Sequence, residues 1–339
     1  MDKEGLFTTI VGSWPLSNNT ENMVRIFSDL IEAGIDYPCY PQLTSMISQF
    51  LSPLAKSIDQ LEEENEKFYL FNDFKIPKKP IALEYGEFIN KFFNERKSLF
   101  EKIKGTKACL TGPLTLASEI ILKGDVAQGV KPRVFSEPRA VMVDWIVEKL
   151  ADVMKQLGKA YNDMGIDIIS MDEPLLGVLV GRKPLFHSED FMVEILNKSI
   201  SEIKGLSSIH VCGRISPKLR DILLQTDVRI LDHEFTTNEK NFEIFSKEHF
   251  EDTDKFLALG TIKSLFGPEN GYNLNDYIET IDSLEIYIKK AISQYGKENL
   301  IIKPDCGFLP LKDTFGENQG YEISISKVRN MVKALNNIK

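Results

Sequence analysis

Short apolar runs alternate with longer amphipathic segments along the whole of this 339-residue chain. Strands that alternate with helices form parallel sheets, and eight such units are the number that closes a (β/α)8 barrel. Eight runs are rich in β-branched and other aliphatic residues: 8–14, 34–39, 108–111, 166–171, 208–212, 229–234, 256–261 and 300–303. The pattern predicts an α/β protein with the fold of a TIM barrel, although Pro38 interrupts the second run and proline is unfavourable inside a sheet.

The segments between the runs carry helix start and stop signals. Ser136-Glu137-Pro138 opens a long amphipathic segment that ends at Gly165. Ser216-Pro217 supplies an N-cap followed by proline at the first helical position, and Gly296 closes the segment 276–295. Helices are therefore expected between the later strands.

Residues 40–106 are too long for a single connection between a strand and a helix. We expect a helical and hairpin-like insertion there, after the second strand. No change of composition, internal repeat or flexible linker divides the chain. The sequence therefore predicts one domain over residues 1–339.

The composition is that of an ordinary globular protein, with 42% hydrophobic and 27% charged residues. A net charge of -9 without a basic stripe argues against a nucleic-acid partner. Neither a signal peptide nor a stretch of about 18 apolar residues is found, so we expect a cytoplasmic protein without a membrane span. Only four cysteines occur, which disfavours a disulfide framework and leaves reduced thiols for metal binding or catalysis.

Polar side chains gather at the carboxyl ends of the predicted strands, where the active site of a TIM barrel lies. They are Ser13, Asp172-Glu173-Pro174, His210, Cys212, Glu234 and Cys306. Because the strands are parallel, residues that are far apart in the sequence are expected to meet at one mouth.

A possible metal site stands out among these residues. His210 and Cys212 are two apart, so on a strand their side chains point to the same side, about 6–7 Å apart along the chain. With Cys306 and Glu234 they offer one imidazole, two thiolates and one carboxylate, a set that favours Zn²⁺ over Mg²⁺ or Ca²⁺. A packed thiol beside a hydrogen-bonded histidine is the alternative. His233 competes with Glu234, and because neighbours on a strand face opposite sides, one of the two must point away.

The remaining histidines and cysteines have no partner motif. We interpret His187 and His249 as structural or solvated residues. Cys39 and Cys109 are interpreted as small buried hydrophobes, although Cys39 follows a predicted strand and could line the mouth.

Six motifs run in one order across nearly the whole chain. They are Ile10-Val11-Gly12-Ser13-Trp14-Pro15, Leu110-Thr111-Gly112-Pro113, Met171-Asp172-Glu173-Pro174, His210-Val211-Cys212, Glu234 and Lys303-Pro304-Asp305-Cys306-Gly307. In these motifs the chain resembles the cobalamin-independent methionine synthases, specifically their C-terminal catalytic half. By this resemblance the zinc ligands are His210, Cys212, Glu234 and Cys306, with His233 left as a neighbouring or core residue. The resemblance also implies a methyltransferase that methylates the thiol of homocysteine.

Zinc chemistry is consistent with that reaction. A zinc ion deprotonates a bound thiol and so supplies a thiolate at neutral pH. Two cysteinates and one glutamate would give the zinc site a formal charge of -1, which suits alkyl transfer better than hydrolysis. Four protein ligands ordinarily indicate a closed structural site. We expect the substrate sulfur to enter as a fifth ligand or by release of Glu234, because the mouth of a barrel is a catalytic position.

The resemblance also implies substrate contacts. Asp172 is expected to hold the amino group of the substrate, and Gly12 and Ser13 are expected to meet its carboxylate through hydrogen bonds. A cap on the next turn is the structural alternative for Asp172. Glu84, or Glu87 nearby in the insertion, is expected as a second acidic contact for the amine.

The methyl donor is expected to differ from that of the full-length enzymes, because the chain departs from the family pattern. It begins directly at Val11-Gly12-Ser13, without the N-terminal half that helps full-length enzymes bind a polyglutamylated folate, and its segment 36–42 also differs. We therefore expect a methylcorrinoid, free or carried by a corrinoid protein, as the donor.

Three other functions stay open. The first is methyl transfer from a corrinoid to another thiol such as coenzyme M, a substrate that would have less need of Asp172. The second is a uroporphyrinogen decarboxylase-like barrel, which needs no metal and does not explain the His-x-Cys and Asp-Cys-Gly motifs. The third is a non-catalytic corrinoid- or metal-binding partner, which a complete ligand set disfavours.

Overall fold

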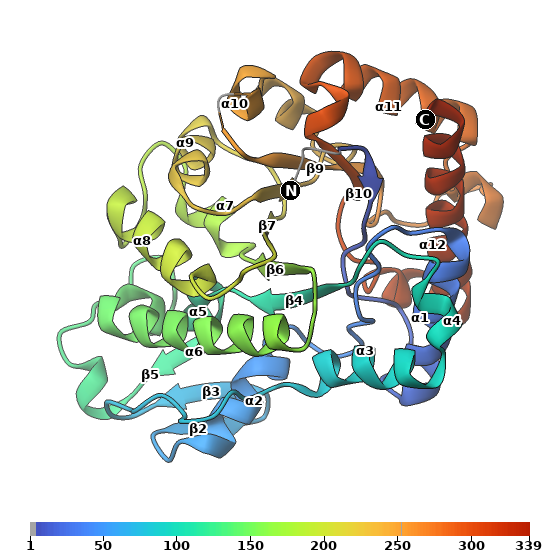
Figure 1. The fold of residues 1–339 in the computed structure, drawn as a ribbon. Coiled ribbons are helices and arrows are strands. Elements are labelled where there is room, and N and C mark those ends of the chain that lie inside the picture. The colour runs from blue at the N-terminus through green and yellow to red at the C-terminus, as the bar shows by residue number, and fades with distance from the viewer. Residues whose placement is uncertain (1–4, 252) are drawn as a thin grey trace.

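In the part of the chain that the structure describes, the main sheet has seven parallel strands, with helices outside it (Figure 1). The computed structural model describes residues 5–251 and 253–339. Strands pair in parallel in the order β1-β10-β9-β8-β7-β6-β4. Their bounds are β1 (Phe7–Thr8), β4 (Lys107–Thr111), β6 (Ile168–Asp172), β7 (Leu206–Val211), β8 (Ile230–His233), β9 (Phe256–Ile262) and β10 (Leu300–Pro304). The prediction of an α/β protein with a parallel sheet is confirmed.

Two predicted runs differ from the structure: the first, 8–14, overlaps β1 only at Thr8, and the second does not form a strand. Parallel bridges join Tyr37 to Thr9 on one side and Cys39 to Lys107 on the other. The N–H of Lys107 donates to the carbonyl of Pro38 (3.0 Å). Pro38 itself has no N–H to give to a ladder, which explains why the expected strand is reduced to isolated bridges between β1 and β4.

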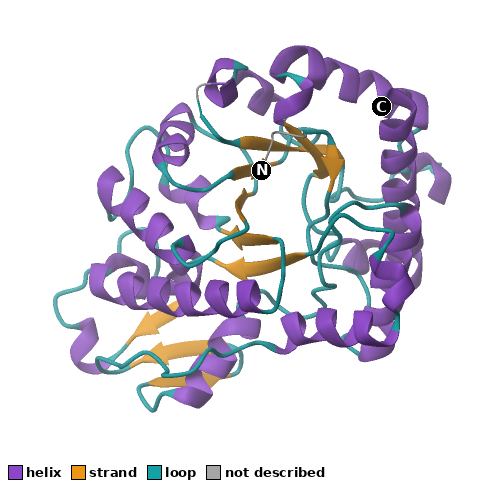
Figure 2. Cartoon of the chain, in the orientation of Figure 1, coloured by secondary structure: helices purple, strands orange, loops and turns teal. Residues whose placement is uncertain are grey.

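Residues 40–106 combine helices with a hairpin. The elements are α2 (Ser48–Ser57), β2 (Leu61–Glu64), β3 (Lys67–Leu70), α3 (Glu84–Glu95) and α4 (Lys97–Phe100). β2 and β3 are antiparallel, and β3 also pairs in parallel with β5 (Ile120–Leu122) to form a separate three-stranded sheet (Figure 2). The sequence predicts the helices and the hairpin, but not the pairing with a strand about 50 residues further along the chain.

Helices cover the outer side of the main sheet (Figure 2). They are α1 (Thr20–Ala33), α5 (Pro113–Glu119), α6 (Asp144–Asp163), α7 (Leu175–Leu179), α8 (Glu189–Ile200), α9 (Pro217–Gln225), α10 (Glu248–Glu251), α11 (Ile281–Tyr295) and α12 (Leu311–Ile338). None of the helices in the described ranges is long and apolar enough to cross a membrane.

The predicted helix boundaries are right in one place and wrong in another. Ser216 Oγ accepts a hydrogen bond from the N–H of Leu219 (3.0 Å), so the predicted N-cap of α9 is confirmed. The predicted start at 136–138 is wrong, because α6 begins at Asp144. Pro138 instead accepts a hydrogen bond from the N–H of Leu122 in β5 (2.9 Å), so extended pairing occupies the residues that carry the helix-start signal.

An apolar cluster closes the amino-terminal end of the main sheet. All its members are buried: Phe7, Tyr37, Ile168, Leu206, Ile230, Phe256, Ala258 and Ile301. Most of them are the first or second residue of their strand. The rings of Phe7 and Tyr37 pack with centroids 4.8 Å apart, so the bridged segment takes part in this closure.

Candidate metal centre and substrate site

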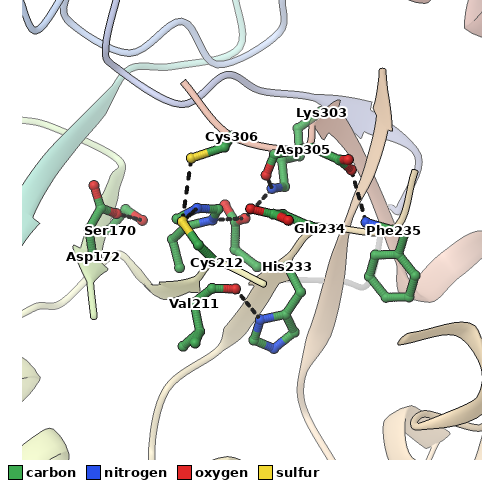
Figure 3. A network of polar contacts seen from close by, with 12 residues as sticks. Ser170, Asp172, Val211, Cys212, His233, Glu234, Phe235, Lys303, Asp305 and Cys306 are labelled. Atoms are coloured by element: carbon green, nitrogen blue, oxygen red, sulfur yellow. Dashed lines mark hydrogen bonds and ion pairs between the residues drawn. The ribbon is translucent and has the colours of Figure 1, made fainter. Parts of the chain in front are cut away.

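Three side chains of the kinds that bind metals meet at the carboxyl end of the sheet, and we call them the metal-binding group. His210 is the fifth residue of β7, Cys212 follows β7, and Cys306 follows β10. Their ligand atoms all lie within 4.8 Å of one another. His210 Nε2 lies 3.1 Å from Cys212 Sγ, and the two sulfur atoms lie 3.4 Å apart. Figure 3 shows Cys212 and Cys306 pointing toward one another, as the strand-end positions predict.

The two thiols of this group are not equivalent. A hydrogen bond with Cys212, aided by His210 and opposed by burial, holds the pKa of the Cys306 thiol well below its usual range. The same hydrogen bond, together with burial, raises the pKa of the Cys212 thiol. Cys306 is therefore the first of the pair to become a thiolate, the form that binds a metal.

Glu234 lies beside this group but is not one of the three. It follows β8 directly and is partly buried. Its Oε2 accepts a hydrogen bond from Asn238 Nδ2 (2.6 Å). Burial, and then the negative charges of Cys306 and Asp305, raise the pKa of its carboxyl group. The carboxylate is thus close enough to sense the thiolate, and its role as a ligand stays a prediction.

His233 points away from the three metal-binding side chains. Its ring lies beside Val211, with Nδ1 3.2 Å from the carbonyl of that residue, as Figure 3 shows. It stacks on Phe245 with ring centroids 5.5 Å apart. Burial lowers the pKa of His233 to about 3, so the imidazole is neutral. The alternation of side chains along β8 therefore assigns His233 to the core and Glu234 to the site.

A charged network that the sequence analysis missed lies beneath His210. Asp232 Oδ1 is 2.6 Å from His210 Nδ1 and 2.6 Å from Lys303 Nζ, while Lys107 Nζ lies 3.5 Å from Asp232 Oδ2. Burial disfavours the charge of Asp232, but Lys303, His210 and Lys107 hold the pKa of this carboxyl group well below its usual range. Burial likewise disfavours a charge on His210, and Asp232 overcomes it to raise the pKa of the ring to about 10.

A signal for this network was present in the sequence. Strands of a parallel sheet are buried on both faces, and a charged residue inside such a strand needs a partner. Asp232 interrupts an apolar run, Lys107 directly precedes one, and Lys303 ends another. Considered together, three charged residues within or at the edge of buried strands would have predicted an internal ion-pair cluster.

Asp305 anchors the loop that follows Glu234. Its carboxylate accepts hydrogen bonds from the N–H groups of Phe235 (2.9 Å), Thr236 (3.0 Å) and Thr237 (2.6 Å), and from the Thr236 hydroxyl (2.5 Å). A Cβ atom on Gly260 would lie 2.0 Å from Asp305 Oδ1, so the site needs glycine there. The Asp-Cys-Gly motif therefore holds the β8 and β10 loops together in addition to supplying Cys306.

Asp172 is the last residue of β6 and is buried next to the metal-binding group. It lies in register with His210 on the neighbouring strand. Burial raises the pKa of its carboxyl group to about 6, although His210 and Lys107 act in the opposite direction. Ser170 Oγ donates to it at 3.4 Å. Its expected contact with a substrate amine stays a prediction.

The capping role considered for Asp172 belongs to its neighbour. The Glu173 carboxylate accepts hydrogen bonds from the N–H groups of Leu114 (2.8 Å) and Thr115 (2.9 Å) and from the Thr115 hydroxyl (2.6 Å), at the start of α5. Burial raises the pKa of Glu173 to about 7. A Cβ atom on Gly112 would lie 2.1 Å from this carboxylate. The Leu-Thr-Gly-Pro and Asp-Glu-Pro motifs are therefore in contact with each other, because the Glu173 carboxylate of the second packs on Gly112 of the first and caps the helix that follows it.

Ser13 lies beside the turn that carries Cys306, and Gly12 precedes it in the loop after β1. The N–H of Phe308 donates to the carbonyl of Ser13 (2.8 Å). A Cβ atom on Gly307 would lie 1.9 Å from Ser13 Oγ, so these two motifs are packed without space between them. The loop after β1 is thus placed at the metal-binding group, and its contact with a substrate carboxylate stays a prediction.

Glu84 and Glu87 are not brought to the metal-binding group. Both are exposed in the first turn of α3. They line a cavity of about 750 Å³ together with residues of α1 and α2, and its described lining includes none of the other predicted site residues. The substrate contact predicted for Glu84 stays a prediction.

The remaining histidines and cysteines mostly have structural surroundings. Cys39 and Cys109 are buried with their sulfur atoms 3.5 Å apart, in accordance with their interpretation as buried residues. His187 is buried between Asp144 (2.9 Å from Nδ1) and the carbonyl of Val141 (2.6 Å from Nε2).

The fold and the site define an α/β protein with a candidate metal centre at the carboxyl end of its parallel sheet, and comparison with known proteins identifies its class as the methyltransferases. Residues 100–337 match the family model described as "Cobalamin-independent synthase, Catalytic domain", and the chain belongs to this family. The methionine synthase of Methanothermobacter thermautotrophicus is 26% identical, with 98% of this chain and 100% of that protein covered.

Two other comparisons bear on the fold and on the length of the relatives. The B12-independent methionine synthase from Shewanella sp. W3-18-1, solved in complex with selenomethionine, aligns with a TM-score of 0.68 at 16% identity, over 98% of each chain. A 5-methyltetrahydropteroyltriglutamate–homocysteine methyltransferase of Campylobacter jejuni is 26% identical over 77% of this chain and 30% of that protein. The chain therefore matches the archaeal relative in full and the Campylobacter relative in part.

Proposed function

We propose that the protein transfers a methyl group to the thiol of homocysteine, forming methionine, and that a zinc ion held by His210, Cys212 and Cys306 activates this thiol. The observation that carries the proposal is the meeting of two thiols and one imidazole within 4.8 Å at the carboxyl end of the sheet. This donor set suits Zn²⁺. When bound, zinc supplies a thiolate from a substrate thiol at neutral pH.

Glu234 is proposed as the fourth ligand. Its carboxylate accepts hydrogen bonds from Asn238 Nδ2 and from the backbone of Gly213, and two carboxylate oxygens with about four lone-pair sites still offer a position to a metal. Three anionic ligands and Zn²⁺ give a formal charge of -1, and the buried ammonium of Lys303 lies close enough to lower the pKa of the Cys306 thiol. A fourth ligand that can leave would make room for the substrate sulfur without loss of the other three.

The substrate contacts follow from the strand ends. We propose that the buried carboxylate of Asp172 receives the amino group of homocysteine and that the Gly12–Ser13 loop receives its carboxylate. Asp172 is in register with His210, and Ser13 packs against the residue after Cys306. Asp172 is thus beside the proposed ligand His210 in the sheet, and Ser13 contacts the residue that follows the proposed ligand Cys306. Two contacts this near to the metal ligands suit a substrate as small as an amino acid.

We also infer that the sheet closes as a (β/α)8 barrel within a single domain over residues 1–339. The support is the set of bridges that Tyr37 and Cys39 make to the two edge strands. Tyr37 also belongs to the apolar cluster at the amino-terminal end. In a closed barrel, residues 37–39 would lie between the edge strands β1 and β4 and would take the place of the eighth strand.

The methyl donor is proposed to be a folate. The Campylobacter jejuni relative carries a methylated pteroyltriglutamate in its name, and neither this relative nor the archaeal one supports the expected methylcorrinoid. Transfer to another thiol such as coenzyme M is the second candidate, and the buried Asp172 argues against it because coenzyme M has no amino group.

One assay tests the function. The zinc-loaded protein is incubated with homocysteine and, in separate reactions, with methyltetrahydropteroyltriglutamate, methylcobalamin or a methylated corrinoid protein, and methionine is measured. Coenzyme M replaces homocysteine in a parallel set. We expect methionine with the folate donor, whereas an absence of methionine with every donor would contradict the proposed function.

A further inference from the structure

Asp232 is an acidic residue buried inside the parallel sheet, in contact with the proposed zinc ligand His210. It is the third residue of β8, is 0% exposed, and lies in register with His210 of β7. Its Oδ1 lies 2.6 Å from His210 Nδ1, the ring nitrogen on the far side from the thiols. Burial of a carboxylate inside a sheet has an unfavourable desolvation free energy unless ion pairs and hydrogen bonds compensate for it.

Two lysines from other strands hold this carboxylate in place. Lys303 Nζ of β10 lies 2.6 Å from Asp232 Oδ1, and Lys107 Nζ of β4 lies 3.5 Å from Oδ2. Both lysines are buried. With two ammonium groups beside it the carboxylate is charged, and a charged carboxylate accepts hydrogen bonds but donates none.

The same network reaches the second proposed ligand. Lys303 Nζ also donates to the backbone carbonyl of Asp305 (2.7 Å), the residue before Cys306. His210 Nε2, on the other side of the ring, lies 3.1 Å from Cys212 Sγ. One buried carboxylate and one buried ammonium therefore link the strand that carries His210 to the turn that carries Cys306.

We propose that Asp232 is a positioning residue that keeps a hydrogen on His210 Nδ1 and thereby leaves Nε2 to the zinc. A ring nitrogen that donates to a charged carboxylate must carry hydrogen, so the lone pair for the metal is on the other nitrogen. Carboxylates in this position orient a ligating histidine and make it a better donor. The inference rests on the proposed zinc site and adds the residue that prepares it.

Asp232→Asn tests the inference, because it keeps the size of the side chain and removes its charge. We expect zinc affinity, measured by competition with a chromophoric chelator, to fall roughly 10- to 100-fold. Asp167→Asn is the matched control. Asp167 is an exposed residue just before β6, at the opposite end of the sheet, and its carboxylate accepts a hydrogen bond from the N–H of Thr106 (2.8 Å). This control should bind zinc as the unmodified protein does.

A second measurement needs no variant, so it holds even if Asp232→Asn does not fold. The chain has four histidines, which makes assignment of the ring ¹⁵N resonances practicable. In the zinc-loaded protein we expect His210 to carry its hydrogen on Nδ1. Hydrogen on Nε2, or zinc affinity within twofold of the unmodified protein in a folded Asp232→Asn variant, would overturn the proposal.

Failure of this inference can be told apart from failure of the proposed function. Both readouts report on zinc and on the histidine ring, and neither needs a methyl donor. Weakened zinc binding in Asp232→Asn without methionine formation in any assay would support the positioning role and count against the function. If the unmodified protein forms methionine but the Asp232→Asn variant binds zinc with unchanged affinity, the proposed function is supported and the positioning role of Asp232 is refuted.

Discussion

The two ends of the parallel sheet are built from the same strands but from opposite kinds of residue. At the amino-terminal end, side chains such as Ile230 and Phe256 form a buried apolar cluster. At the carboxyl end, His210, Cys212 and Cys306 place three ligand atoms within 4.8 Å. β8 alone passes from Ile230 to Asp232 within three residues. The comparison indicates that stability and chemistry are separated along each strand, so substitutions at the two ends should have separable effects.

Removal of a proposed ligand should give the largest effect at the carboxyl end. Cys306→Ala is expected to abolish zinc binding while the protein stays folded. Activity should fall by more than the roughly 10- to 100-fold that is typical when a residue hydrogen-bonded to a metal ligand is replaced. Zinc content by elemental analysis and circular dichroism check this. Cys109→Ala is the matched control, because it removes a buried thiol from β4 outside the metal-binding group. Full activity in Cys306→Ala would refute the ligand assignment.

Removal of apolar volume should have the largest effect at the amino-terminal end. Ile230→Ala is expected to lower the free energy of unfolding by about 2–5 kcal/mol, because Ile230 is 2% exposed and leaves a cavity. Urea unfolding measures this change. Zinc affinity of the folded variant should equal that of the unmodified protein. A variant that is folded but has lost zinc would show that the two ends are not separable.

Glu173 links stability to pH at the carboxyl end. Burial raises its pKa to about 7, so between about pH 4.5 and 7 the folded protein holds the proton more tightly than the unfolded chain. Its contribution to the free energy of unfolding therefore falls as the pH rises through this window, by at most about 3 kcal/mol. Glu173→Gln should remove this part of the pH dependence in urea unfolding. Identical pH profiles for both proteins would rule out the raised pKa.

Asp172→Asn should have the smallest effect and should separate substrate binding from metal binding. Loss of a charge-assisted hydrogen bond costs about 1.5–3 kcal/mol, so we expect KM for homocysteine to rise roughly 10- to 100-fold. Zinc content should not change. Steady-state kinetics with a competing thiol that lacks an amino group provides the control, since its KM should be unaffected. An unchanged KM for homocysteine would remove Asp172 from the substrate site.

Much of the fold could be predicted because the apolar runs of a parallel sheet are local patterns. The second predicted strand does not form because Pro38 has no N–H, and this is visible in the sequence. The bridges that its neighbours Tyr37 and Cys39 make to β1 and β4 could not be predicted from it. The pairing of β3 with β5, and the wrong helix start at 136–138, depend on contacts between residues distant in the chain. Local propensity cannot report such contacts.

The site was predictable where it depends on position along a strand and unpredictable where it depends on partners across strands. His210 and Cys212 share a side because they are two residues apart, and His233 faces the core because it is next to Glu234. The contact of Asp232 with Lys303 joins residues that are 71 positions apart in the sequence. Glu84 was assigned without a motif, and it lines a cavity whose described lining includes none of the other predicted site residues.

Zinc X-ray absorption with and without homocysteine tests the central claim most directly. The claim is that the carboxyl end of the sheet holds zinc through Cys212, Cys306 and His210 and admits a substrate thiol. We predict two sulfur ligands in the zinc-loaded protein and a third sulfur ligand when homocysteine is added. A ligand shell that homocysteine leaves unchanged would contradict the claim and would make the zinc structural.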